Sequence, residues 1–258
     1  MELIDWSDLL KGPLNVLPYG EPGCGKTRLA LSVGEVLYTL YLDVDNGLKT
    51  ILTIPKAQRD LWMSNIVPLR FTDFKDLDKI YQLLTKNDPV LWTKHFASIG
   101  HPEVIITKPF EAIVVDTWSM MNWEIKEEKR KNIGKQGAGA LAFRPNIEIQ
   151  DWGNIIDLNE MAIKAFCELP VTFVCCMHEQ FFEDKKGGRT SGTPAINGKF
   201  APEIGKYFDI VGHMSVNVTG DYVMDTAMKA RYQAKTRIPL EKQLKHITYK
   251  GILDAIIK

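Results

Sequence analysis

The clearest chemistry in this 258-residue sequence lies in the stretch GEPGCGKT, residues 20–27. Its spacing, G-x-x-x-x-G-K-[ST], is that of a phosphate-binding P-loop. The glycines let the backbone turn tightly and bring successive N–H groups close to phosphate oxygens. The ammonium group of Lys26 would reach the terminal phosphates, and the hydroxyl of Thr27 would hold Mg²⁺. The stretch predicts a site for ATP and Mg²⁺, with nucleotide contacts from Gly20, Glu21, Pro22, Gly23, Cys24, Gly25, Lys26, Thr27 and Arg28.

A second candidate group is the carboxylate of Asp116, which directly follows the apolar residues 112–115. A carboxylate at the end of a buried parallel strand lies at the edge of the sheet where ligands bind. Beside a P-loop, Asp116 would hold Mg²⁺ through water, because this ion keeps several of its waters in proteins. The alternative is that Asp116 caps the helix expected after Thr117.

Hydrolysis also needs a group that orients or deprotonates the attacking water. Asp45 follows the expected second strand, residues 38–42, and should reach the same edge of the sheet. Asp43 lies two residues earlier and would share its strand face, so it is the alternative base. Either carboxylate could instead serve only the turn, since Asp-Asn-Gly is a strong turn sequence.

His178 follows another apolar run, residues 171–177, and is expected to end the last strand of the parallel set. There its imidazole could hydrogen-bond the γ-phosphate, or a water on it, and report the nucleotide state to the glycine-rich residues 183–200. The alternative is a histidine that only caps a buried strand end.

The order of the segments predicts how these residues are positioned. An apolar run at 14–19, the glycine loop and a helix-patterned stretch occur in the order that a P-loop needs. Further strands are expected at 66–71 and 111–117, helices at 73–84 and 151–168, and an irregular insertion at 87–110. Residues 208–218 and 222–234 look like a closing β region, and a short helix is expected at 252–258. We therefore predict a single α/β domain over residues 1–258, with a mainly parallel sheet flanked by helices and a C-terminal antiparallel extension.

The composition sets limits on partners and compartment. The formal net charge is +0, so no global basic field attracts nucleic acid, and any such contact needs local patches. The four cysteines form no disulfide framework or metal pattern, which fits a reducing compartment. No apolar run has the length of a signal peptide or of a bilayer span. We expect a cytoplasmic protein with no membrane partner.

Together, these parts resemble the RecA-type ATPase core, and most closely the small phage-encoded, Sak-type recombination ATPases often described as AAA-type NTP-binding proteins. The resemblance covers about residues 12–240. It rests on GEPGCGKT, LDVDNG, IVVDT, QDWG, VCCMHE and AKTR in this order. It implies a RecA-like P-loop NTPase fold, and the host cytoplasm as the compartment if the chain is phage-encoded.

The resemblance also implies roles for individual residues. Asp45 takes the catalytic carboxylate position, where RecA has Glu, and His178 takes that of the nucleotide-sensing Gln. Asp116 is the Walker B acid. Lys235 and Arg237 stand where basic fingers reach the ATP of a neighbouring subunit, which implies a homo-oligomer, with ring or filament left open.

Two segments, 124–150 and 180–200, correspond to the DNA-binding loops of this family. Their basic residues include Lys131 and Lys135 in the first, and Lys185, Lys186 and Arg189 in the second. Flexible basic loops can follow a phosphate backbone, and nearby phenylalanines could stack on bases. The alternative is a pair of solvated surface loops without a ligand.

The resulting hypothesis is an ATPase stimulated by single-stranded DNA, acting in phage-type recombination, annealing or replication. The alternative is a nucleotide-gated loader or switch that binds a replication protein or a single-strand-binding protein. A small-molecule kinase ranks last, because the sequence after the P-loop shows no paired-arginine lid.

Overall fold

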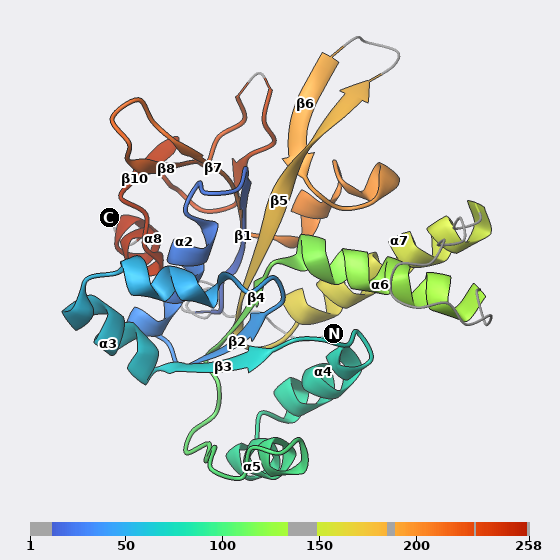
Figure 1. The fold of residues 1–258 in the computed structure, drawn as a ribbon. Helices are drawn as coiled ribbons and strands as arrows, with labels where there is room; N and C mark the ends of the chain where they lie inside the picture. Colours follow the sequence, from blue (N-terminus) through green and yellow to red (C-terminus); the bar gives the residue numbers. More distant parts are fainter. Residues whose placement is uncertain (1–11, 134–148, 185–188, 230, 257–258) are drawn as a thin grey trace, which may run out of the picture.

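A central β-sheet organises the computed structural model, which describes residues 12–133, 149–184, 189–229 and 231–256 (Figure 1). The strand order is β10-β8-β7-β1-β5-β4-β2-β3, with β6 paired to β5 and β9 paired to β7. The strands are β1 (Asn15–Gly20), β2 (Thr39–Asp43), β3 (Ile66–Arg70), β4 (Ala112–Asp116), β5 (Thr172–Asp184), β6 (Arg189–Pro194), β7 (Ile210–Val216), β8 (Tyr222–Asp225), β9 (Lys235–Thr236) and β10 (Gln243–Lys245). Strands β7, β1, β5, β4, β2 and β3 run parallel, whereas β8 and β10 add antiparallel.

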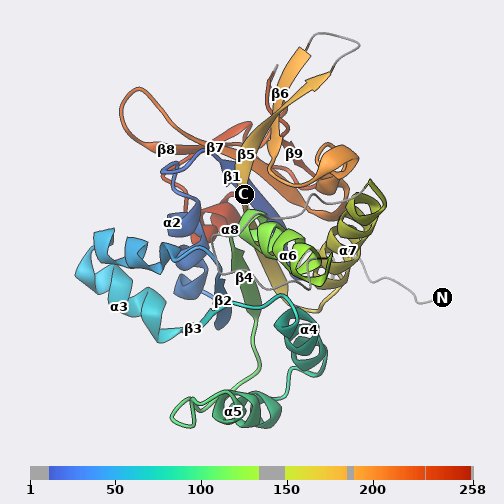
Figure 2. The same cartoon turned by 45° about the vertical axis from the view of Figure 1, so that its right-hand side comes forward.

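Helices cover both faces of this sheet (Figure 2). They are α2 (Lys26–Leu31), α3 (Lys56–Ser64), α4 (Asp76–Lys86), α5 (Pro89–Ser98), α6 (Trp118–Ile133), α7 (Ile149–Cys167) and α8 (Tyr249–Ile256), with short 3-10 turns η1 (Ser32–Glu35), η2 (Gly47–Thr53), η3 (Gly198–Phe200) and η4 (Ile204–Tyr207). Helices α2, α3 and α8 pack on one face, and α4, α6 and α7 pack on the other.

Alternation along the strands explains why two separate cores form. On β4, Ile113 and Val115 contribute to the core under α4, α6 and α7, while Val114 contributes to the core under α2, α3 and α8. Because parallel strands covered on both faces bury every side chain, they appear in the sequence as continuous apolar runs. The predicted α/β architecture, with a mainly parallel sheet and C-terminal antiparallel strands, is confirmed.

The prediction that residues 87–110 are irregular is wrong for their first half, which forms α5. Asp88 caps this helix, because its side chain accepts a hydrogen bond of 2.7 Å from the backbone N–H of Val90. Pro89 occupies the first turn, where its missing N–H costs no hydrogen bond. Trp92 and Phe96 are buried in the main core, so this segment belongs to the packed structure.

The strand expected to stop at His178 continues to Asp184 as the first arm of a hairpin. Residues from Glu179 onward leave the parallel sheet and pair antiparallel with β6. The predicted loop at 180–200 therefore contains strand residues 180–184 and 189–194. Glycine favoured a loop in the prediction, but a hairpin arm accommodates Gly192 because the side chains of Glu179 and Tyr232 leave no room there for a Cβ.

The predicted loop at 124–150 begins inside a helix, since α6 extends to Ile133. Its run of lysines and glutamates suits a helix as well as a loop, because both residue types are good helix formers. Within the described part of the chain, none of the helices is long and apolar enough to cross a lipid bilayer.

Candidate active site

The P-loop lies between the end of β1 and the start of α2. Gly23 and Gly25 have φ angles of +82° and +93°, in the left-handed region that favours glycine. Gly20 is required for a different reason, since a Cβ there would lie 2.3 Å from the carbonyl oxygen of Met214. The loop glycines predicted from spacing are thus explained by backbone angle and by close packing.

The side chain of Lys26 folds back over this loop. Its Nζ atom donates hydrogen bonds to the carbonyl oxygens of Gly20, at 2.9 Å, and of Glu21, at 2.8 Å. The side chain is buried, and the sulfur of Cys24 lies 3.6 Å from the same Nζ. An ammonium group held in this way is positioned to meet phosphate oxygens bound by the loop.

Asp116 is fully buried at the end of β4 and faces Thr27. Its Oδ2 accepts a 2.7 Å hydrogen bond from the hydroxyl of Tyr41. A Cβ placed on Gly47 would lie 3.3 Å both from this Oδ2 and from Oγ1 of Thr27, so the three residues share one small space. Burial raises the pKa of Asp116, and hydrogen bonds from Tyr41 and Thr27 oppose this shift. Its Oδ1 has no hydrogen-bond partner among the described residues.

A hydroxyl beside a buried carboxylate with an unpaired oxygen fits Mg²⁺ as a ligand set, because this ion prefers oxygen ligands and retains waters. The described residues include no cluster of three His, Cys, Asp or Glu side chains that could hold a metal alone. The ion would therefore rely on Thr27, Asp116 and the phosphates.

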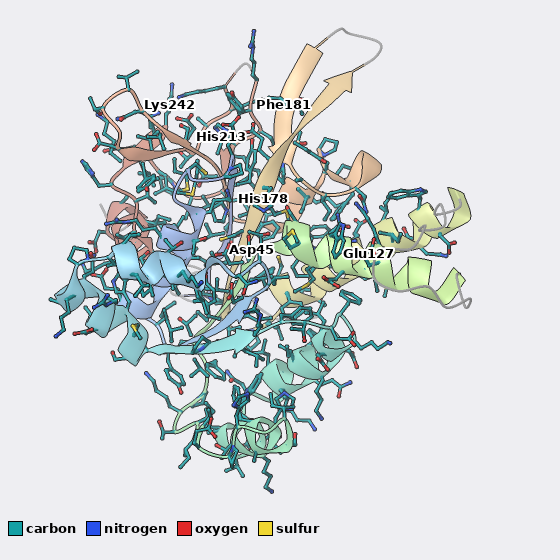
Figure 3. The ribbon with its side chains drawn as sticks, viewed as in Figure 1. Asp45, Glu127, His178, Phe181, His213 and Lys242 are labelled. Carbon is teal, nitrogen blue, oxygen red and sulfur yellow. The ribbon has the colours of Figure 1, made fainter. Side chains whose placement is uncertain are left out.

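The two candidate bases differ in what they contact. Oδ1 of Asp43 accepts a 2.9 Å hydrogen bond from the backbone N–H of Gly47, so Asp43 stabilises the turn after β2. Asp45 instead faces the site, with Oδ2 lying 3.7 Å from Nε2 of His178 (Figure 3). Burial, followed by the charge of Asp116, raises the pKa of Asp45. A carboxylate with a raised pKa is a better proton acceptor, so the geometry favours Asp45.

His178 lies beside the first glycine of the P-loop, since it pairs in register with Gly20 across β1 and β5. Burial, followed by the charge of Lys26, lowers its pKa, which keeps the imidazole neutral near pH 7. Its Nδ1 has no partner among the described residues. Its backbone N–H donates to the hydroxyl of Ser119, which in turn donates to the carbonyl of Ala195 after β6.

Lys235 and Arg237 are not brought to the P-loop of their own chain. Lys235 lies in β9, which pairs with Ile210 and Val211 at the start of β7. The P-loop lies farther along β7, beside Met214. Nη1 of Arg237 lies 3.5 Å from Oδ1 of Asp209, so this arginine has an acidic partner. The strand predicted at 222–234 is confirmed for residues 222–225, which form β8, and is wrong beyond Asp225.

The predicted DNA-binding residues are placed only in part. Lys131 lies in α6 and Arg189 in β6, described at the level of the backbone. Lys135, Lys185 and Lys186 lie outside the described residues. Phe181, on the hairpin arm β5, has 59% of its side chain exposed (Figure 3).

Sequence patterns missed a hollow beside α2. Its volume is about 240 Å³, and its lining is Arg28, Gly220, Asp221, Tyr222, His246, Ile247 and Thr248. The ring of Tyr222 packs on the P-loop, at 2.8 Å from the position of a Cβ on Gly25. Tyr41 was also missed, although its place two residues before Asp43 on β2 puts it on the face of the site.

The fold and the loop together define a P-loop nucleotide-binding protein. The strand that carries the P-loop is separated from the strand ending in Asp116 by β5, and both end at the same edge of the sheet. A profile of the AAA domain family matches residues 13–238, and the chain belongs to this family of P-loop ATPases. A search of curated proteins finds no match.

Proposed function

We propose that this protein hydrolyses ATP at the site formed by residues 20–27, Asp45, Asp116 and His178, and that it acts on single-stranded DNA in recombination, annealing or replication. The observation that carries the enzymatic part is the convergence beside the P-loop of Asp45 after β2, Asp116 at the end of β4 and His178 within β5. Family membership independently supports nucleotide binding and hydrolysis.

Each residue then has a defined task. Lys26 neutralises charge on the terminal phosphates, and the loop N–H groups bind their oxygens. Thr27 and Asp116 would hold Mg²⁺, whose charge would stabilise the negative charge that develops on the phosphates. Asp45 accepts a hydrogen bond from the attacking water and then its proton. Neutral His178 donates to the γ-phosphate or to that water.

The hollow beside α2 suits the nucleoside of ATP. Arg28 follows the P-loop directly, so a nucleotide whose phosphates fill the loop extends toward this side chain. Tyr222 offers a ring on which a base stacks, and such stacking contributes about 1–3 kcal/mol. The site therefore has a place for each part of ATP.

The DNA-binding part of the proposal rests on the hairpin β5–β6. This hairpin leaves the sheet directly after His178, and it carries exposed Phe181. In the sequence, Lys185 and Lys186 follow the last residue of β5, and Arg189 is the first residue of β6. A hairpin continuous with the nucleotide-sensing strand is well placed to join DNA binding to ATP turnover.

The test is ATP turnover of the full chain with and without single-stranded oligonucleotide, with Lys26→Ala as the control. We expect stimulation by DNA and no turnover in the control. An ATP turnover rate that is the same with and without DNA, together with binding to a replication or single-strand-binding protein, would favour a nucleotide-gated loader. A phosphorylated small product would point to a kinase.

Replacing Lys185, Lys186 and Arg189 together by alanine tests the hairpin. We expect weaker binding to single-stranded DNA and a flatter dependence on salt, with the slope of log affinity against log salt falling by about 0.7 for each lost phosphate contact. A slope equal to that of the unchanged protein would show that these residues do not touch the backbone of DNA.

A further inference from the structure

A buried acid–base pair lies behind the P-loop, on the face of the sheet opposite to the nucleotide site. Oε2 of Glu179, on β5, lies 3.5 Å from Nε2 of His213, on β7. Because β1 lies between β5 and β7, the two side chains approach each other across the strand that carries the P-loop. Their side chains are only 4% and 6% exposed.

Both residues are adjacent to parts of the candidate active site. Glu179 directly follows His178, and neighbouring residues of a strand point to opposite faces. His213 pairs in register with Tyr19, the residue before Gly20, and their rings lie 5.2 Å apart. A change in this pair therefore acts on both sides of the phosphate site at once.

Aromatic side chains and the hairpin enclose the pair. The ring of Tyr232 stacks on His213 with centroids 3.9 Å apart. The hydroxyl of Tyr19 donates to the carbonyl of Gln233 at 2.7 Å. A Cβ on Gly192 of β6 would lie 2.2 Å from Oε1 of Glu179, so the second arm of the hairpin packs directly on this carboxylate.

Core packing alone explains this pair poorly. Burying a carboxylate and an imidazole has a desolvation cost that apolar side chains of similar size avoid. Oε1 of Glu179 and Nδ1 of His213 also lack hydrogen-bond partners among the described residues. A pair that is costly to bury and placed between the hairpin and the P-loop strand is better explained by a task at the site.

We propose that Glu179 and His213 are positioning residues, which together fix the end of β5, and with it His178, against the P-loop strand. The inference rests on the proposed function, since it assigns the pair an effect on ATP turnover. Because Gly192 contacts Glu179, the β5–β6 hairpin packs directly on this pair. A movement of the hairpin would therefore displace Glu179 and, with it, the neighbouring His178.

The test compares Glu179→Gln, His213→Gln and the double variant in full-length protein. Glutamine keeps the size of Glu179 and removes its charge. We expect kcat to fall about tenfold or more in each single variant, because small misplacements of catalytic groups have effects of this size, while KM for ATP changes less than about threefold. If the two residues act as one unit, the double variant falls no further than either single variant.

The matched control is Glu203→Gln, which removes a carboxylate that is 61% exposed and pairs with Lys206 at 3.2 Å. Its kcat should equal that of the unchanged protein. The inference is wrong if both single variants keep their kcat per folded molecule and lose only thermal stability. It is also wrong if the two effects on kcat multiply in the double variant, or if neither single variant folds. Absence of turnover in the unchanged protein would instead refute the proposed function.

Discussion

Nε2 of His178 lies 3.7 Å from Oδ2 of Asp45, although the strands that carry them are not neighbours in the sheet. Asp45 follows β2, His178 lies in β5, and β4 with its terminal Asp116 runs between them. The three side chains therefore form a row along one edge of the sheet, beside the P-loop. In the proposed function, this row places the candidate base, the proposed metal-binding Asp116 and the imidazole of His178 beside the terminal phosphate of ATP.

The base assignment is tested by comparing Asp45→Asn with Asp43→Asn. An amide cannot accept the proton of water, so Asp45→Asn should bind ATP normally and lose about 10²–10⁴-fold in kcat. Asp43→Asn removes the acceptor of the Gly47 N–H and should mainly lower thermal stability. ATP binding is followed with a fluorescent analogue and turnover by phosphate release. Normal turnover in Asp45→Asn with loss in Asp43→Asn would assign the base to Asp43.

The pKa shift of Asp45 predicts how activity depends on pH. Burial raises the pKa of this carboxyl in the folded protein, so it becomes protonated, and inactive as a base, at a higher pH than an exposed Asp. Measured kcat/KM should therefore fall on the acid side at a pH above the usual Asp range. The residual activity of Asp45→Asn should not show this fall at acid pH. If the acid-side fall in kcat/KM persists unchanged in Asp45→Asn, it is caused by the titration of another residue.

The hollow beside α2 is tested with Tyr222→Ala. Loss of the stacking ring should raise KM for ATP about tenfold and leave kcat within about threefold, because the base is bound equally in the ground and transition states. Tyr222→Phe keeps the ring and serves as the matched control. Equal KM values for all three proteins would place the base elsewhere.

The resemblance to RecA-type ATPases predicts that Lys235 and Arg237 act on the ATP of a neighbouring subunit. Burial, followed by the charge of Arg237, lowers the pKa of Lys235, whereas Arg237 already has Asp209 as an acidic partner. A phosphate from a neighbour would satisfy both. Mixing Lys26→Ala with the double variant Lys235→Ala/Arg237→Ala should partly restore turnover. No recovery in mixtures shown to co-assemble would mean that the residues act in their own subunit, or have no catalytic role.

Short-range patterns were sufficient to predict the P-loop, the acid at the end of β4 and the alternation of strands and helices. The P-loop can be predicted from a short stretch of sequence, because the spacing of its glycines and its Lys–Thr pair determines its geometry. Buried parallel strands are equally visible, since both of their faces are apolar. Asp45 and His178 were predicted as separate strand-end residues.

Tertiary structure alone decided which of these residues meet. The order of strands in the sheet placed Asp45 beside His178. Asp43 instead accepts a hydrogen bond from the backbone of Gly47 in the turn that follows β2. Pairing of β5 with β6 converted a glycine-rich stretch into a hairpin arm, because hydrogen bonds and packing between the two arms outweighed the preference of single residues. Tyr222 reached Gly25, and Glu179 reached His213, only through the positions of β7 and β8. Contacts between residues far apart in the chain depend on strand order, which no local pattern encodes.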